Sequence, residues 1–169
     1  KLERGCRVPA QEYAKFVFTL RRLVVEALFL FKEDEKWLGR TGAYFCLADA
    51  RTGAPLFEPA LVGSVLPEKS EKYLSFCQEK ARRLASHPEH EASWESRNPD
   101  AGQWGGAVRV GDFIFSISGF PELGDEALML IMAEIHCSNE PAVLETVTHI
   151  AGQSNNPYWR NLRGFIGRF

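Results

Sequence analysis

A tight turn between two apolar segments limits what this chain can fold into more than any other feature. The dipeptide Gly111-Asp112 separates residues 107–110 from residues 113–118. Glycine and aspartate tolerate the positive φ angles that a two-residue hairpin turn requires. The pattern therefore predicts a pair of antiparallel strands. An almost wholly apolar segment follows at residues 125–135, and it predicts a central helix that opens on two acidic residues.

Other periodic segments predict more helices and a second hairpin. The second hairpin joins residues 43–48 to residues 55–62, and Pro55 and Pro59 make the latter an edge strand because proline has no N–H group. Residues 86–103 are polar and rich in turn formers, so we expect a long loop there. The predicted helices cover residues 16–31, 67–85, 125–135, about 139–152 and 158–169.

The helical pattern of residues 67–85 separates apolar from charged positions. Tyr73, Cys77 and Leu84 recur at helical spacing and should face the core. The basic residues of this segment, Lys80 and Arg83 among them, are expected on its solvated surface.

Composition limits the classes of partner. The chain has 169 residues, of which 45% are hydrophobic and 25% charged, so it can bury a core as one compact domain. Its formal net charge of −2 gives no overall attraction to nucleic acid or to an anionic membrane surface, and neither is expected as a partner. The charges within residues 16–31 also argue against a membrane span, since each would cost about 2.5 kcal/mol or more in hydrocarbon.

The first helix carries more apolar residues than one buried stripe needs. On the surface of a monomer it would leave Phe or Leu side chains in water. Two interpretations remain open: a homo-oligomer interface through residues 10–33, or cover from the aromatic C-terminus, whose Tyr158, Trp159, Leu162 and Phe165 could dock there.

The cysteine spacing favours free thiols. Cys6, Cys46, Cys77 and Cys137 are separated by dozens of residues and form no C-x-x-C pair. Reduced structural cysteines suggest a cytoplasmic protein. Because the chain begins with Lys1, a removed targeting segment stays open.

The densest group of possible metal ligands is the run from His87 to Glu91. Imidazole and carboxylate groups suit zinc or iron, so His87 and His90 are candidate metal ligands, and a solvated polar loop is the alternative. The same histidines with Glu89 would be the polar set of an enzyme acting on a small metabolite. No G-x-S-x-G sequence is present, and we assign no catalytic residue. The glycines beside Trp104 lead into a strand and predict tight turns and close backbone approach rather than a phosphate loop.

The segment from Gly105 to Gly119, followed by Gly124-Asp125-Glu126-Ala127, resembles the signature region of the GlcG/HbpS-like family, once labelled haem-degrading. Upstream, residues 47–53 look like its first hairpin and residues 79–82 look like the helix that follows. The likeness spans about residues 10–135 of a single domain, 1–169, and leaves residues 136–169 as a helical C-terminal extension.

The resemblance implies an α+β fold that is profilin-like, with an antiparallel sheet of about five strands flanked by helices, usually assembled into oligomers. It implies a non-enzymatic ligand-binding or sensing module, with haem as the best-known ligand of the family. Haem would need an axial donor, for which His87 and His90 are the candidates. A protein–protein scaffold without a ligand and an enzyme remain the alternatives. The candidate ligand-binding residues are His87, His90, Trp104, Gly105, Gly106 and Ser118.

Overall fold

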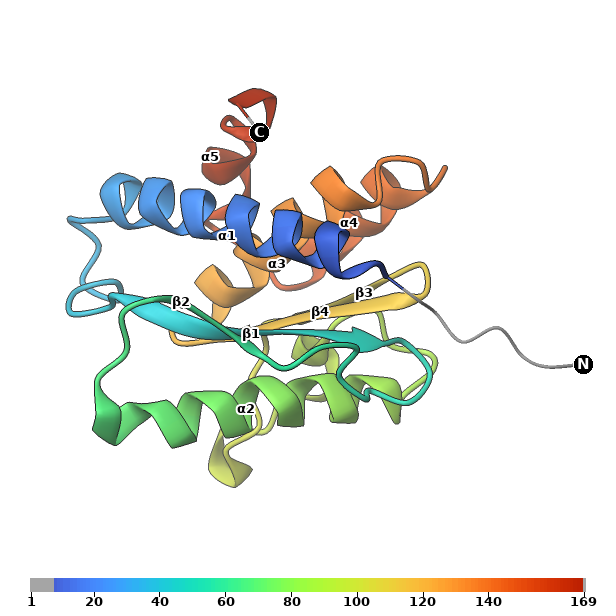
Figure 1. The fold of residues 1–169 in the computed structure, drawn as a ribbon, viewed down its shortest axis with the longest axis horizontal. Coiled ribbons are helices and arrows are strands. Elements are labelled where there is room, and N and C mark those ends of the chain that lie inside the picture. Colours follow the sequence, from blue (N-terminus) through green and yellow to red (C-terminus); the bar gives the residue numbers. More distant parts are fainter. Residues whose placement is uncertain (1–7, 169) are drawn as a thin grey trace, which may run out of the picture.

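The computed structural model describes residues 8–168 and shows a mixed α/β fold built on one antiparallel sheet (Figure 1). Neighbouring strands follow the order β2-β1-β4-β3. Phe45 lies opposite Ile117 in the central pair, and Val110 lies opposite Phe113 next to the hairpin turn. The four strands are β1 (Gly42–Asp49), β2 (Ala60–Gly63), β3 (Ala107–Val110) and β4 (Phe113–Ser118).

Helices cover both faces of the sheet. One face carries α2 alone among the long helices, and the other carries α1 and α3 with α4 and α5 behind them (Figure 1). Short 3-10 helices interrupt the loop between α2 and β3. The helices are α1 (Ala10–Leu30), α2 (Pro67–Ala85), α3 (Glu122–His136), α4 (Val143–Gln153) and α5 (Trp159–Arg163), and the 3-10 helices are Ser93–Ser96, Pro99–Ala101 and Ile166–Arg168.

The main strand and helix predictions are confirmed. The hairpin turns at Gly111, whose φ is +58°, and α2 has the predicted bounds. The second hairpin is also present, but its outer strand is only Ala60–Gly63, because Pro55 and Pro59 cannot donate to a ladder; Pro55 makes one isolated bridge to Ala48. Within residues 8–168 the sheet has four strands, where the resemblance implied about five.

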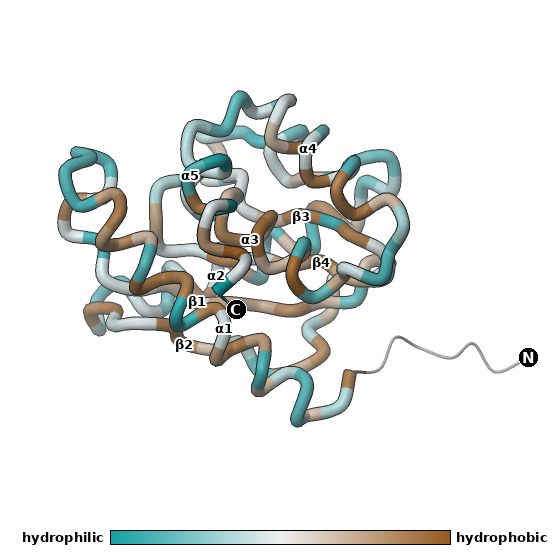
Figure 2. Tube along the Cα trace, turned by 90° about the horizontal axis from the view of Figure 1, so that it is seen from above, coloured by the Kyte–Doolittle hydropathy of each residue, from teal (hydrophilic) through white to brown (hydrophobic). Residues whose placement is uncertain are grey.

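The strands alternate their side chains between two apolar cores. The larger core lies against α1 and α3 and includes Phe45, Phe115 and Ile117 from the sheet. The smaller core places Cys46 and Ile114 against the inner face of α2. The tube in Figure 2 is hydrophobic along much of α3, whose residues 124–133 are all buried, so the prediction of a central helix is confirmed.

Four charged residues, two on α2 and two on α3, are buried where the sequence did not predict burial of a charge. Lys80 and Arg83 were expected in solvent, but both are buried on α2. Asp125 and Glu126 were expected at a helix start, but α3 begins three residues earlier, at Glu122, and both carboxyl groups are buried. The helical repeat explains the first error, because Lys80 lies three residues after Cys77 and four before Leu84, on the stripe that packs.

The C-terminal extension packs mainly on α3 rather than on the outer side of α1. Tyr158 makes edge-on ring contacts with Phe31 and Trp37, and Leu162 is fully buried. The predicted helix over 158–169 is shorter: Asn156 accepts the N–H groups at the start of α5, and Gly164 ends it. The preceding helix also begins later than predicted, at Val143, after a turn.

A buried carboxyl group ties this extension to α3. Glu126 Oε2 accepts hydrogen bonds from Ser154 Oγ and from Asn156 Nδ2, the latter at 2.8 Å. Burial raises the pKa of Glu126 to about 7, although both hydrogen bonds act to lower it.

Cys46 and Cys77 are free and buried, as expected for structural thiols. Cys137 is also buried, and Cys6 lies outside the described residues. Among the helices described, none combines the length and hydropathy needed to cross a membrane.

Candidate functional site

A cavity of about 550 Å³ opens where the N-terminal half of α2 passes the end of β4 and the first turn of α3. Residues 38–40, which lead into β1, form part of its rim. We call it the Lys80 cavity. Its lining includes Arg40, Tyr73, Lys80, Trp104, Phe120 and Asp125.

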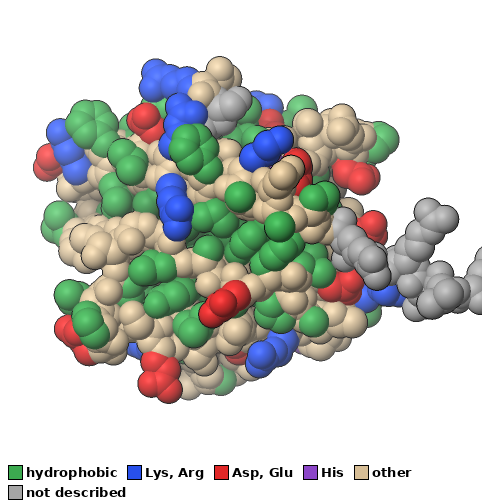
Figure 3. Space-filling view, viewed as in Figure 1, with side chains coloured by type: hydrophobic (Ala, Val, Ile, Leu, Met, Phe, Trp, Pro, Cys, Tyr) green, Lys and Arg blue, Asp and Glu red, His purple; other side chains and the backbone are tan. Residues whose placement is uncertain are grey.

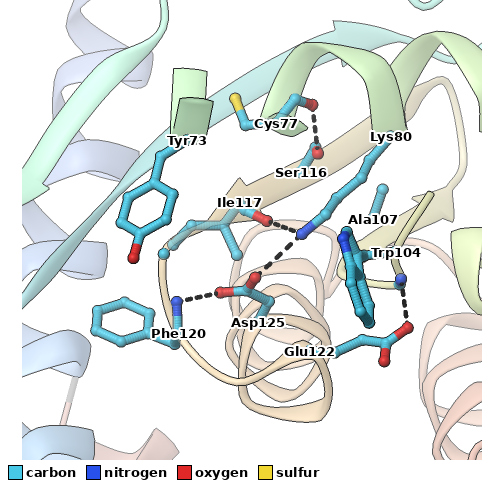
Figure 4. A network of polar contacts seen from close by, with 12 residues as sticks. Tyr73, Cys77, Lys80, Trp104, Ala107, Ser116, Ile117, Phe120, Glu122 and Asp125 are labelled. Atoms are coloured by element: carbon cyan, nitrogen blue, oxygen red, sulfur yellow. Dashed lines mark hydrogen bonds and ion pairs between the residues drawn. The ribbon is translucent and has the colours of Figure 1, made fainter. Parts of the chain in front are cut away.

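The floor of the Lys80 cavity is a buried ion pair (Figure 4). Lys80 Nζ lies 3.0 Å from Asp125 Oδ2 and donates a second hydrogen bond, of 2.8 Å, to the carbonyl oxygen of Ile117. The other carboxylate oxygen, Asp125 Oδ1, accepts the N–H of Phe120 at 3.0 Å. Burial raises the pKa of Asp125 to about 6, against the opposing effect of the Lys80 ammonium group.

The two glycines before β3 make room for this pair. Gly106 has a φ of +117°, and a Cβ atom there would lie 2.8 Å from both Lys80 Nζ and Asp125 Cβ. Gly105 donates its N–H to Glu122 Oε1 at 2.8 Å. The close backbone approach predicted for these glycines is therefore present, and it serves the floor of the cavity.

Aromatic rings form the walls. Figure 4 shows Tyr73 and Trp104 on opposite sides of the Lys80–Asp125 pair, with Phe120 beside Tyr73. Arg83 holds the backbone of the Trp104 wall in place, because its guanidinium donates to the carbonyl oxygens of Trp104 and Ser93. The sequence placed Arg83 in solvent and gave it no such role.

The rim carries positive charge. Arg40, Lys69 and Lys72 line it, and Arg40 donates to Tyr73 Oη at 3.3 Å and to the carbonyl oxygen of Gly119 at 3.1 Å. Glu122 is held by Arg97 through two hydrogen bonds of 2.7 and 2.8 Å. Four basic and two acidic residues line the cavity, and both acids already have a basic partner. The cavity therefore favours an anion.

The structure brings together part of the predicted ligand-binding set. Trp104 and Ser118 line the Lys80 cavity, and Gly105 and Gly106 support it from behind. His87 and His90 do not reach it. The sequence analysis missed the pairing of Lys80 with Asp125, because these residues are 45 positions apart in the chain.

The two histidines lie in a turn after α2. Their rings stack on each other with centroids 4.7 Å apart, and His87 Nδ1 lies 2.8 Å from the carbonyl oxygen of Arg83. Arg109 holds this turn by donating to the carbonyl oxygens of His87, Pro88 and His90. The same guanidinium also reaches the carbonyl oxygens of Ala50 and Leu84.

The metal site predicted at the two histidines is not supported by the described residues, and an axial role toward haem stays a prediction. Across residues 8–168 there is no cluster of three or more His, Cys, Asp or Glu side chains able to hold a metal ion. For haem, His87 and His90 lie outside the Lys80 cavity, so they cannot supply an axial ligand there.

No protein-family model matches the chain, and neither a curated protein nor a solved structure is detectably similar to it.

Proposed function

We propose that this protein is a non-enzymatic module that binds or senses a small organic molecule in the Lys80 cavity. The observation that carries the proposal is the cavity itself. Its volume of about 550 Å³ falls within the range of roughly 300–1,000 Å³ typical of small-molecule sites. Aromatic walls and a few buried polar groups are the usual lining of such sites.

The same cavity favours a binding module over the two alternatives. A scaffold that only binds proteins has no use for a cavity of this size next to a buried ion pair. For an enzyme, the strongest acid–base groups would be Lys80 and Asp125, but these two groups are engaged with each other and with the backbone. Acid–base catalysis would require one of these groups to exchange a proton with the substrate, whereas ligand binding does not.

We extend the proposal to fold family and compartment. The hairpin around Gly111 and the paired glycines at 105 and 106 support the profilin-like arrangement of the GlcG/HbpS-like family. The free buried thiols of Cys46 and Cys77 support the cytoplasm, where cysteines stay reduced.

We further propose that the protein acts as a homo-oligomer through α1. Phe18, Val25 and Phe29 lie on one stripe of that helix and are 63%, 67% and 70% exposed. Hydrophobic side chains gather on the face that Figure 3 shows. Arg22 lies within the stripe, and Arg21 and Glu26 lie beside it, so the surface carries both signs of charge.

Native mass spectrometry tests the ligand proposal. Protein isolated from its source should carry a small molecule that is released on denaturation. Trp104→Ala should lose it because one wall is gone, and the control Trp94→Ala should keep it because Trp94 is not in the lining. Equal retention by both variants would place the ligand elsewhere. If the wild type carries nothing, and no neutral, anionic or cationic fragment gives saturation-transfer NMR signals with it, the proposal is wrong.

A further inference from the structure

Charges in the Lys80 cavity are separated by depth, and this separation constrains the ligand that the proposed function requires. The positive rim is made by Arg40, Lys69 and Lys72. Among the described residues, no carboxylate lies within ion-pair distance of Arg40, whose two hydrogen bonds go to neutral oxygens. Its guanidinium has five N–H donors, so several stay available for an anion at the mouth.

The floor is electrically balanced. Lys80 and Asp125 neutralise each other, and both are only 2% exposed. An ammonium group has three N–H donors, and the described residues accept two of them, through Asp125 and the Ile117 carbonyl. An anionic group at this depth would face the Asp125 carboxylate and lose its hydration. The floor therefore favours a neutral hydrogen-bond acceptor.

Between rim and floor the cavity is aromatic. Tyr73 and Trp104 stand on opposite sides of the floor pair, and Phe120 adds a third ring (Figure 4). Offset or edge-on contacts with such rings favour a flat ring over a puckered one.

We propose that the Lys80 cavity binds an aromatic carboxylic acid that carries a neutral acceptor, a hydroxyl or carbonyl oxygen, at the far end of its ring. The carboxylate lies at the rim against Arg40, with Lys69 and Lys72 adding positive potential. The ring lies between Tyr73 and Trp104. The acceptor takes the third N–H of Lys80.

A set of small probes separates these three contributions. 4-Hydroxybenzoate should bind, measured by isothermal titration and by saturation-transfer NMR. Its amide, 4-hydroxybenzamide, should bind at least about tenfold more weakly, since a charge-assisted hydrogen bond is lost. Benzoate, which lacks the acceptor, should bind roughly fivefold more weakly than 4-hydroxybenzoate. Cyclohexanecarboxylate should bind more weakly than benzoate, because it keeps the charge and loses the flat ring.

Matched variants place the carboxylate. Arg40→Gln should weaken binding of 4-hydroxybenzoate by about tenfold or more and leave binding of the amide nearly unchanged. Arg160→Gln makes the same change of charge on the exposed surface of α5 and should have no effect. If Arg40→Gln does not fold, the salt dependence of binding to the wild type still tests the charge contribution of the rim. Added salt should weaken binding of 4-hydroxybenzoate and leave binding of 4-hydroxybenzamide nearly unchanged.

The outcomes distinguish this inference from the proposed function. If the amide or benzylamine binds as well as the acid, or if Arg40→Gln and Arg160→Gln behave alike, the ligand class is wrong while the cavity remains a binding site. If no probe binds and no molecule is retained from the source, the proposed function is wrong and this inference with it.

Discussion

The ammonium group of Lys80 lies 3.0 Å from the carboxylate of Asp125, and these two residues come from helices on opposite faces of the sheet. The ion pair therefore connects α2 to α3 past the end of β4, whose Ile117 carbonyl accepts the second Lys80 hydrogen bond. The ion pair therefore contributes to the stability of the fold and also forms the floor of the cavity.

Removing one member of this pair should be costly. Lys80→Met leaves the buried Asp125 carboxylate without its counter-charge, and Asp125→Asn does the same to the Lys80 ammonium group. Each variant should therefore lower the free energy of unfolding by about 3–5 kcal/mol. The double variant Lys80→Met with Asp125→Leu should lose much less stability than the two single variants lose together. Urea unfolding at pH 8 measures all three. Strictly additive losses would show that the two groups do not depend on each other.

Replacing Gly106 by alanine should disturb the same floor. The added Cβ atom would meet Lys80 Nζ and Asp125 Cβ at 2.8 Å, in a backbone conformation with φ of +117°. We expect a loss of about 3 kcal/mol from strain and overpacking. Gly152→Ala is the control, because nothing lies within 4 Å of its Cβ position in α4, and it should be neutral or stabilising by up to about 1 kcal/mol. Thermal unfolding of the two variants side by side decides the matter.

Glu126 should make the folded state less stable as the pH rises. Its pKa is about 7 in the folded protein and near 4.5 when unfolded, so the folded state binds the proton more tightly. The stabilisation is complete below pH 4.5 and is lost as the pH passes 7, a change on the order of 3 kcal/mol. Glu126→Gln should therefore be more stable than the wild type at pH 8 and similar to it near pH 4.5.

Urea midpoints across this pH range test the assignment to Glu126. Asp125 and His136 also titrate with shifted pKa values, but both are present in wild type and variant, so the difference between the two proteins isolates Glu126. The exposed Glu145→Gln supplies a control for the loss of one carboxylate. A constant difference between wild type and Glu126→Gln at every pH would contradict the prediction.

A charge on the α1 stripe should break the proposed oligomer. Val25→Glu places a carboxylate among Phe18 and Phe29, and burial of that charge between two copies is unfavourable. Light scattering after size exclusion should show an assembly for the wild type and a monomer for Val25→Glu. Leu144→Glu changes another exposed apolar residue, on α4, and should keep the assembly. A wild-type monomer would refute the interface.

Local sequence patterns predicted much of the fold and little of the site. The hairpin at Gly111, the bounds of α2 and the buried α3 follow from turn chemistry and from hydrophobic periodicity, which act over a few residues. The floor of the cavity depends on Lys80 and Asp125 meeting across 45 residues, which no local pattern records. The stripe position of Lys80 was a signal for its burial, but its charge suggested solvent instead.

The histidine-rich turn shows the opposite error. His87 and His90 attracted attention because their side chains can bind metals, yet in the fold they stack on each other away from the cavity. Arg40 and Tyr73, which form the rim and one wall, stood in segments with no chemical motif. Their roles follow from the position of residues 38–40 beside α2, which depends on the tertiary packing.

Arg109 binds the turn after α2 entirely through main-chain carbonyl oxygens. Every amino acid offers that same acceptor, so these hydrogen bonds do not depend on which side chains residues 87–90 carry. Related chains can thus be expected to vary at the exposed Pro88 and Glu89, and a designer could place an epitope or a label there while Arg109 still holds the backbone.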